Sequence, residues 1–147
     1  MYRFLICITL PGILFISACT SKPAESLPAL KNTWTVEMTH SGGIAGISRS
    51  IEISSDGTYR VKDDHSGSEN EGQLAAEVLE ELKRLVDSTL YSPVSEETGC
   101  ADCFEYDLVI AGTGEPFKAH VDDVNLEDSG LGPLVMFLRT IMERELN

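Results

Sequence analysis

Residues 47–62 read Ile-Ser-Arg-Ser-Ile-Glu-Ile-Ser-Ser-Asp-Gly-Thr-Tyr-Arg-Val-Lys. Apolar and polar side chains alternate on both sides of Asp56-Gly57, a dipeptide that tolerates the positive φ of a tight hairpin turn. The same alternation occurs upstream, where Trp34, Val36 and Met38 are separated by Thr35 and Glu37. These residues predict a three-stranded meander with one buried and one solvent-facing side.

The rest of the chain predicts two helices and two more strands. Residues 63–72 are acidic and polar and predict a loop, and residues 73–88 place Leu74, Val78, Leu82 and Leu85 on one helical stripe. Alternation over 104–110 and 117–121 predicts strands, and a last helix opens at Pro133. The predicted order is βββαββα, an α+β two-layer sandwich in which two helices cover an antiparallel sheet of about five strands.

Composition excludes several classes of protein. The chain has 147 residues, and 24 Asp and Glu against 11 Lys and Arg give a formal charge of −13. Nucleic-acid binding depends on clusters of Lys and Arg, so we expect no nucleic-acid partner. The length and the 42% of apolar residues fit one domain with its own core.

The N-terminus carries a processing signal. Arg3, an apolar run over 4–16 and the small residues Ser17 and Ala18 have the order of a secretory signal peptide. The run is too short to cross a bilayer as a helix. Residues 16–19, Ile-Ser-Ala-Cys, resemble the bacterial lipobox, which implies cleavage before Cys19 and lipid attachment to its sulfur.

Three regions follow from this interpretation. Residues 1–18 are the predicted signal peptide, residues 19–32 the lipidated Cys19 and a flexible tether with two prolines, and residues 33–147 the folded domain. Acyl chains then anchor the protein without a membrane-spanning helix. The expected location is the cell envelope, on a bacterial membrane and facing outside the cytoplasm.

Of the four cysteines, two are expected to remain in the folded domain. Cys7 belongs to the signal peptide and Cys19 is the lipidation site, which leaves Cys100 and Cys103. A Cys-x-x-Cys pair is a redox dithiol, half of a zinc site or a structural disulfide. The pair precedes a predicted strand rather than a helix, and no second ligand pair accompanies it, so a disulfide formed outside the cytosol is favoured.

No motif indicates an enzyme. Asp122, Asp123, Glu127 and Asp128 miss the spacing of a calcium loop, and a solvated turn is preferred to weak calcium binding. Motifs of serine hydrolases, zinc proteases and nucleotide-binding loops are absent from the sequence. We therefore expect no catalytic residues, no metal and no cofactor.

The glycine-rich segment 41–49 reads Ser-Gly-Gly-Ile-Ala-Gly-Ile-Ser-Arg. Its glycines give the backbone access to positive φ and let another chain approach closely. In one interpretation it is an ordinary hairpin with Ile44 folded back onto the core. In the other, Ile44 is presented to a partner.

This segment resembles the emfourin (protealysin-inhibitor) family, small bacterial proteins that inhibit thermolysin-like zinc metalloproteases. The similarity covers roughly residues 33–145. The matching features are Val36-Glu37-Met38 running into 41–49, the mid-chain helix, Tyr106-Asp-Leu-Val-Ile110 leading to Asp122-Asp123, and the Pro133-Leu134 helix. The lipoprotein signal and the pair Cys100 and Cys103 depart from the family pattern.

The resemblance implies an inhibitor whose partner is a thermolysin-like metalloprotease, and the lipobox implies that this inhibitor is lipid-anchored. Such enzymes favour a bulky apolar residue just after the scissile bond, and Ile44 lies between small neighbours that fit a narrow cleft. The backbone of Gly42, Gly43 and Ala45 is then expected to pair with an edge strand of the protease. The alternative is a structural or ligand-binding envelope lipoprotein of the same fold. The expected partner-binding residues are Ser41, Gly42, Gly43, Ile44, Ala45, Gly46 and Arg49.

Overall fold

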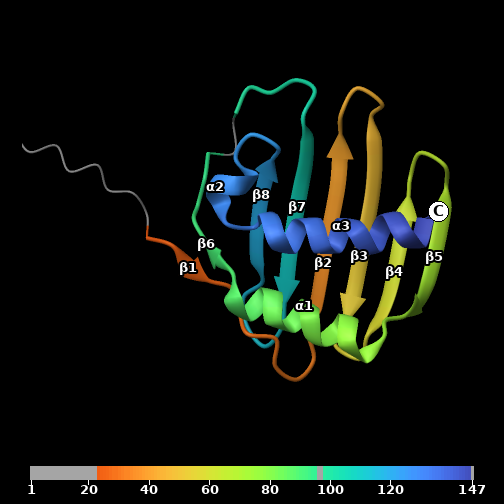
Figure 1. The fold of residues 1–147 in the computed structure, drawn as a ribbon, viewed down its shortest axis with the longest axis vertical. Helices are drawn as coiled ribbons and strands as arrows, with labels where there is room; N and C mark the ends of the chain where they lie inside the picture. The colour runs from red at the N-terminus through yellow and green to blue at the C-terminus, as the bar shows by residue number, and fades with distance from the viewer. Residues whose placement is uncertain (1–22, 96–97, 147) are drawn as a thin grey trace, which may run out of the picture.

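A computed structural model describes residues 23–95 and 98–146 (Figure 1). The predicted signal peptide and Cys19 lie outside the described residues. In chain order the elements are β1 (Glu25–Ser26), β2 (Thr35–Gly42), β3 (Ile47–Ser54), β4 (Thr58–Asp63), β5 (Ser68–Gln73), α1 (Ala76–Ser88), β6 (Leu90–Tyr91), β7 (Phe104–Ala111), β8 (Phe117–Asp122), α2 (Leu126–Ser129) and α3 (Gly132–Leu146).

The main sheet is antiparallel and has six strands in the order β5-β4-β3-β2-β7-β8. The α+β class and the antiparallel sheet are therefore as expected, but the expected count of about five strands is one too low. The meander β2-β3-β4 has the predicted alternation, with Val36 opposite Ile53 and Met38 opposite Ile51. At the β3–β4 turn, Gly57 has φ of 87°, and the amide of Thr58 donates to Oδ1 of Asp56 at 2.9 Å.

The additional strand is β5, within the segment that was expected to be a loop. It pairs with β4 along its whole length, with Asn70 opposite Val61 and Gly72 opposite Tyr59. Neither Asn70 nor Gly72 offers an apolar side chain to the core side, so the strand shows no hydrophobic alternation in the sequence. The expectation of a loop over 63–72 was wrong because an edge strand can form on backbone pairing and cross-strand contacts alone.

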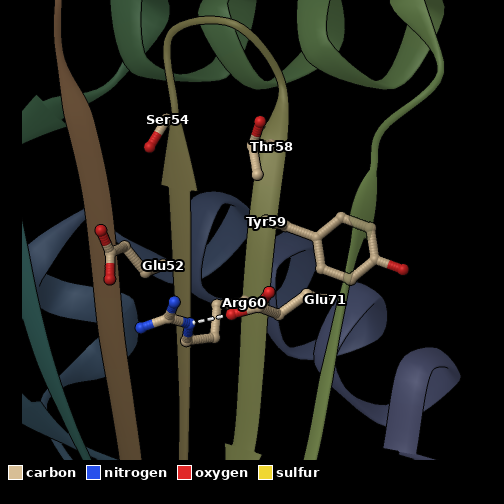
Figure 2. Close-up of a pocket in the computed structure, with 6 residues that line it drawn as sticks. All are labelled: Glu52, Ser54, Thr58, Tyr59, Arg60 and Glu71. Carbon is tan, nitrogen blue, oxygen red and sulfur yellow. Dashed lines mark hydrogen bonds and ion pairs between the residues drawn. The ribbon is translucent and has the colours of Figure 1, made fainter.

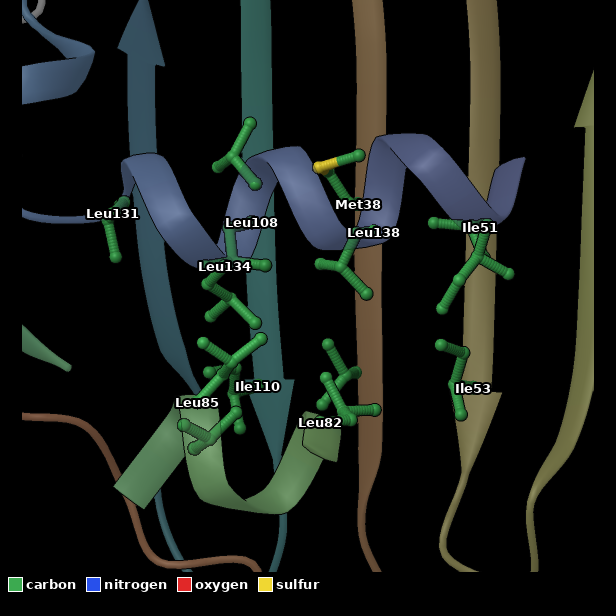
Figure 3. Close-up of a cluster of buried hydrophobic side chains, with 14 of the residues drawn as sticks. Met38, Ile51, Ile53, Leu82, Leu85, Leu108, Ile110, Leu131, Leu134 and Leu138 are labelled. Atoms are coloured by element: carbon green, nitrogen blue, oxygen red, sulfur yellow. The ribbon is translucent and has the colours of Figure 1, made fainter. Parts of the chain in front are cut away.

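Helices α1 and α3 cross the same face of the sheet (Figure 1). Leu82 and Leu85 of α1 and Leu134 and Leu138 of α3 point onto apolar strand residues (Figure 3). Burial of each such side chain contributes about 1.5–3 kcal/mol, so packing on the sheet stabilises these helices more than intrinsic propensity does. The strand residues beneath them are Met38, Ile51, Ile53, Leu108 and Ile110.

The described part of the predicted tether is not free of the domain. β1 pairs with β6, placing Glu25 opposite Tyr91 and Ser26 opposite Leu90. Leu27 belongs to the core cluster and is 6% exposed. The expectation of a flexible tether over 19–32 is therefore wrong from Glu25 to Leu27, because one buried leucine and a two-residue strand hold this part to the domain.

A glycine hairpin supported by the disulfide segment

The β2–β3 hairpin ends in a tight turn formed by the predicted glycine segment. Its last pairs are Ser41 with Ser48 and Gly42 with Ile47. The amide of Gly46 then donates to the carbonyl oxygen of Gly43 at 2.9 Å, which closes a four-residue β-turn. Positive φ values of 93° at Gly42, 68° at Gly43 and 59° at Gly46 explain the three glycines.

Ile44 and Ala45 occupy the two central positions of this turn. Both are exposed, and Ile44 is 92% exposed, the highest value among the exposed large apolar side chains of the described residues. Ile44 is therefore not folded back onto the core. Apolar side chains scattered singly over a surface are common, so its exposure gains meaning from the fixed backbone that presents it.

The glycine turn contacts the residues at the start of β7. The amide of Gly43 donates to the carbonyl oxygen of Cys103 at 3.0 Å. A Cβ atom on Gly42 would collide with that same carbonyl, and one on Gly43 would lie 2.5 Å from Cε1 of Phe104. Two of the three glycines are thus required by close approach as well as by backbone conformation.

Residues 100–104, which contact the glycine turn, are also bonded to one another and to the turn after β8. Cys100 and Cys103 are joined by a disulfide, with Cα atoms 5.6 Å apart, as the sequence favoured. The amide of Phe104 donates to Oδ2 of Asp123 at 3.0 Å, and the amide of Asp123 donates to the carbonyl oxygen of Phe104 at 3.1 Å. Residues 100–104 therefore lie between the glycine hairpin and the turn that follows β8.

A histidine of β2 is buried close to the glycine turn. His40 is 3% exposed, its ring stacks on that of Tyr106, and it makes a T-shaped contact with the ring of Phe104. Burial lowers the pKa of His40, and the nearby cationic Arg139 lowers it further. The hydroxyl of Tyr106 donates to Oδ1 of Asp123 at 3.2 Å, so this aromatic group is linked to the same turn after β8.

Arg49 does not join the residues at the tip. It lies opposite His40 in the register, and its Nε donates to Oδ2 of Asp63 at 3.0 Å. Backbone hydrogen bonding from Ser66, helped by Arg49, holds the pKa of Asp63 below its usual value. The structure thus places Ser41 to Gly46 at the turn, whereas Arg49 lies two pairs further along β3 and is paired with Asp63.

The acidic turn after β8 is partly structural. Asp122 is buried, and its Oδ1 accepts from the amides of Val124 and Asn125 at 2.9 and 3.1 Å. The hydroxyl of Thr98 donates to its other oxygen. Burial opposes ionisation, but these hydrogen bonds outweigh it and lower the pKa of Asp122. The expectation of a solvated turn is wrong for this residue.

Other parts of the described surface are weaker candidates for a binding site. The hollow drawn in Figure 2 has a volume of about 180 Å³ and lies over β3, β4 and β5. The positive charge of Arg60 in this hollow is already paired, because its Nε lies 2.5 Å from Glu71 and 3.3 Å from Glu69. Within residues 23–95 and 98–146 no group of three or more His, Cys, Asp or Glu residues has the arrangement of a metal site.

Sequence reasoning missed Phe104, Asp123 and His40 as parts of this region. Their proximity depends on β7 pairing with β2, which no local pattern indicates. The chain offered one signal, since Phe104 directly follows the cysteine pair.

No helix among the described residues is long and apolar enough to cross a membrane.

Comparison with known proteins gives no further guide to the family. No protein-family model matches this chain, and no curated protein matches it.

Proposed function

We propose that this protein is a lipid-anchored inhibitor of thermolysin-like zinc metalloproteases and that the turn Gly43-Ile44-Ala45-Gly46 enters the protease cleft. The observation that carries the proposal is the exposed Ile44 on a turn whose conformation is fixed from within. The resemblance of residues 41–49 to the emfourin family supports the same function.

The geometry favours inhibition over cleavage. Proteases bind substrates as extended strands, in which backbone groups pair with the enzyme. Here the hydrogen bond from Gly46 to Gly43 holds the segment as a turn. Ile44 then fills an apolar pocket while the neighbouring peptide bond stays out of the extended alignment that hydrolysis requires.

Preorganisation provides part of the affinity. A free peptide loses conformational freedom when it binds, at a cost of about 0.5–1.5 kcal/mol for each ordered side chain and more for its backbone. The hairpin is ordered before binding. Because the amide of Gly43 already donates to Cys103, the backbone that pairs with the protease is that of Ile44 and Ala45 rather than of Gly42 and Gly43.

The proposed lipid on Cys19 keeps the inhibitor close to the membrane. Six Cα–Cα steps separate Cys19 from Glu25, where β1 begins, and they span at most about 22 Å. The domain has an excess of acidic residues, so attachment relies on acyl chains rather than on charge. The inhibitor would thereby protect envelope proteins from proteases that act there.

An inhibition assay tests the proposal. The fragment 20–147 contains every residue of the described core and lacks the proposed lipidation site, so it can be titrated without detergent against a thermolysin-like protease with a peptide substrate. We expect inhibition by the fragment and a loss of at least about 100-fold in affinity for Ile44→Asp, because burial of an isoleucine is worth about 1.5–3 kcal/mol and a buried carboxylate adds a penalty.

A matched control uses another exposed apolar residue. Leu90 is 62% exposed and lies in β6, away from the hairpin (Figure 1). Leu90→Asp should inhibit as well as the unchanged fragment. Absence of inhibition by the unchanged fragment, or equal inhibition by Ile44→Asp, would contradict the proposed function.

A further inference from the structure

Cys103 connects two features that the proposed function treats separately. Its sulfur is bonded to Cys100, and its carbonyl oxygen accepts the hydrogen bond from Gly43. The next residue, Phe104, places its ring against Gly43. The disulfide loop and the glycine turn are therefore in direct contact through one residue and its neighbour.

We propose that the Cys100–Cys103 disulfide is a redox latch that orders the glycine hairpin. In the oxidised state the short covalent ring fixes the carbonyl of Cys103 where Gly43 needs its acceptor. In the reduced state residues 99–103 gain conformational freedom, and the turn 43–46 keeps its contact with Phe104 but loses the covalent restraint on the residue that accepts the hydrogen bond from Gly43. The inference deepens the proposed function by naming a regulation of the same site, and it also holds as a statement about the hairpin alone.

The latch is accessible to reductants. Cys100 is an exposed residue, whereas Cys103 is half-buried. A thiolate of a dithiol reductant attacks the sulfur of Cys100, the bond to Cys103 breaks, and the Cys103 thiolate takes up a proton. The second thiol of the reductant then displaces the Cys100 sulfur, which also becomes a thiol. Two electrons pass to the protein, and the reductant leaves as a disulfide.

The consequence of reduction is local. Phe104 keeps its place in β7, where it lies opposite Gly42, and keeps its two hydrogen bonds to Asp123. The core cluster contains neither cysteine. Reduction thus removes a restraint from the segment before Phe104 while the sheet and the helices remain packed.

Amide hydrogen exchange of the fragment 20–147 measures the latch directly. Reduction by dithiothreitol should speed the exchange of Gly43 and Gly46 by at least about ten-fold, the size expected when a short covalent loop stops constraining its neighbours. The internal control is Gly67, whose amide donates to the carbonyl oxygen of Asp63 at 2.8 Å in the β4–β5 hairpin. Its exchange should not change.

The double variant Cys100→Ser/Cys103→Ser gives a second measurement without a reductant. Its Gly43 and Gly46 amides should exchange as in the reduced protein, and dithiothreitol should have no effect on them. Unchanged exchange of Gly43 in a sample with two titratable thiols would overturn the proposal. Equal acceleration of Gly67 would also overturn it, because the disulfide would then stabilise the whole domain rather than the hairpin.

Inhibition by the double variant separates the latch from the proposed function. The variant avoids a dithiol, which would bind the zinc of the protease. Weaker inhibition by about ten-fold, together with faster exchange, supports both inferences. Faster exchange without inhibition by either protein supports the latch and contradicts the proposed function. Equal inhibition by both proteins despite faster exchange overturns the regulatory role.

Discussion

The imidazole ring of His40 stacks on the phenol ring of Tyr106, with centroids 4.9 Å apart and an angle of 11° between the planes. His40 lies opposite Arg49 on one neighbouring strand and opposite Tyr106 on the other. Its Nε2 atom is buried without a hydrogen-bond partner among the described residues. The surroundings therefore favour the neutral imidazole, since a charged ring would lack both water and an acceptor.

Stability should fall as the solution becomes acidic because of His40. Burial lowers its pKa first, Arg139 and Arg49 lower it further, and Glu143 and Asp123 oppose the shift. The unfolded chain then binds a proton near pH 6.5, where the folded protein does not. Above that pH the group has no effect. Below it, the free energy of unfolding decreases by at most about 1.4 kcal/mol per pH unit until His40 protonates in the folded state.

The variant His40→Phe isolates this contribution. Phenylalanine keeps the aromatic packing and cannot take up a proton. Urea unfolding at pH 7.5 and pH 5.5 should show a smaller loss of stability for the variant than for the unchanged protein. His65 and His120 are present in both proteins and cancel in the comparison. The same loss in both would mean that His40 binds its proton equally well in the folded and unfolded states.

Two glycines of the turn should differ in their tolerance of alanine. Gly43 and Gly46 both have positive φ, which costs about 1–2 kcal/mol for a residue with a Cβ atom. At Gly46 no atom lies within 4 Å of the added Cβ, whereas at Gly43 it would lie 2.5 Å from Cε1 of Phe104. We therefore expect Gly43→Ala to lower the free energy of unfolding by about 1 kcal/mol more than Gly46→Ala.

Urea denaturation of the two alanine variants measures this difference directly. Each variant serves as the control of the other, since the change in the unfolded chain is the same at both positions. A cost for Gly43→Ala no greater than that for Gly46→Ala would show that Phe104 yields freely, which would also weaken the case that it transmits the state of the disulfide.

The local pattern of the sequence was sufficient for the meander but not for the order of the strands. Alternation at Met38 and Ile51 marks which side chains point inward, and the Asp56-Gly57 turn sets the register of β3 against β4, in which Ile51 lies opposite Val61. The pairing of β7 with β2 arises from long-range packing, to which no local period refers. Strand β5 could not be predicted from alternation because Asn70 and Gly72, which are not apolar side chains, occupy its inward positions.

The candidate site was predictable to the same extent. The glycines of the turn and Ile44 are contiguous in sequence, so the hairpin could be recognised from its composition. Its support by Phe104 could not, because that contact follows from the order of the strands. Arg49 was grouped with the turn through the resemblance of residues 41–49 to the emfourin family, and in the structure its side chain pairs with Asp63, which lies opposite it on β4.

Leu27 should matter more than its place in a proline-containing segment suggests. It is 6% exposed, whereas Leu90 on the strand that pairs with β1 is 62% exposed. Leu27→Ala should lower the free energy of unfolding by about 2–3 kcal/mol through lost burial and an unfilled cavity, and Leu90→Ala by less than about 0.5 kcal/mol. Thermal unfolding of the two variants compares the same chemical change at two depths. Similar costs would mean that the segment before Thr33 is not part of the cooperative unit.

The last turn of α3 should be held to the sheet by an acid-sensitive contact. The hydroxyl of Tyr59 donates to Oε2 of Glu145 at 2.5 Å, and this hydrogen bond, together with Arg144, lowers the pKa of Glu145. The stabilisation is therefore complete above the usual pKa of 4.5 and declines as the pH falls below it. Tyr59→Phe should lower the free energy of unfolding by about 1–2 kcal/mol at pH 7, as expected for a hydrogen bond to a partly exposed carboxylate.

A double-mutant cycle with Glu145→Gln measures the coupling between these two side chains. At pH 7 the coupling should be favourable and close to the cost of Tyr59→Phe alone. Lowering the pH to 3 shifts Glu145 toward its protonated form, so the cost of Tyr59→Phe should shrink toward its value in the Glu145→Gln background. A cost that is the same at both pH values would show that the tyrosine stabilises α3 through packing of its ring and not through the carboxylate.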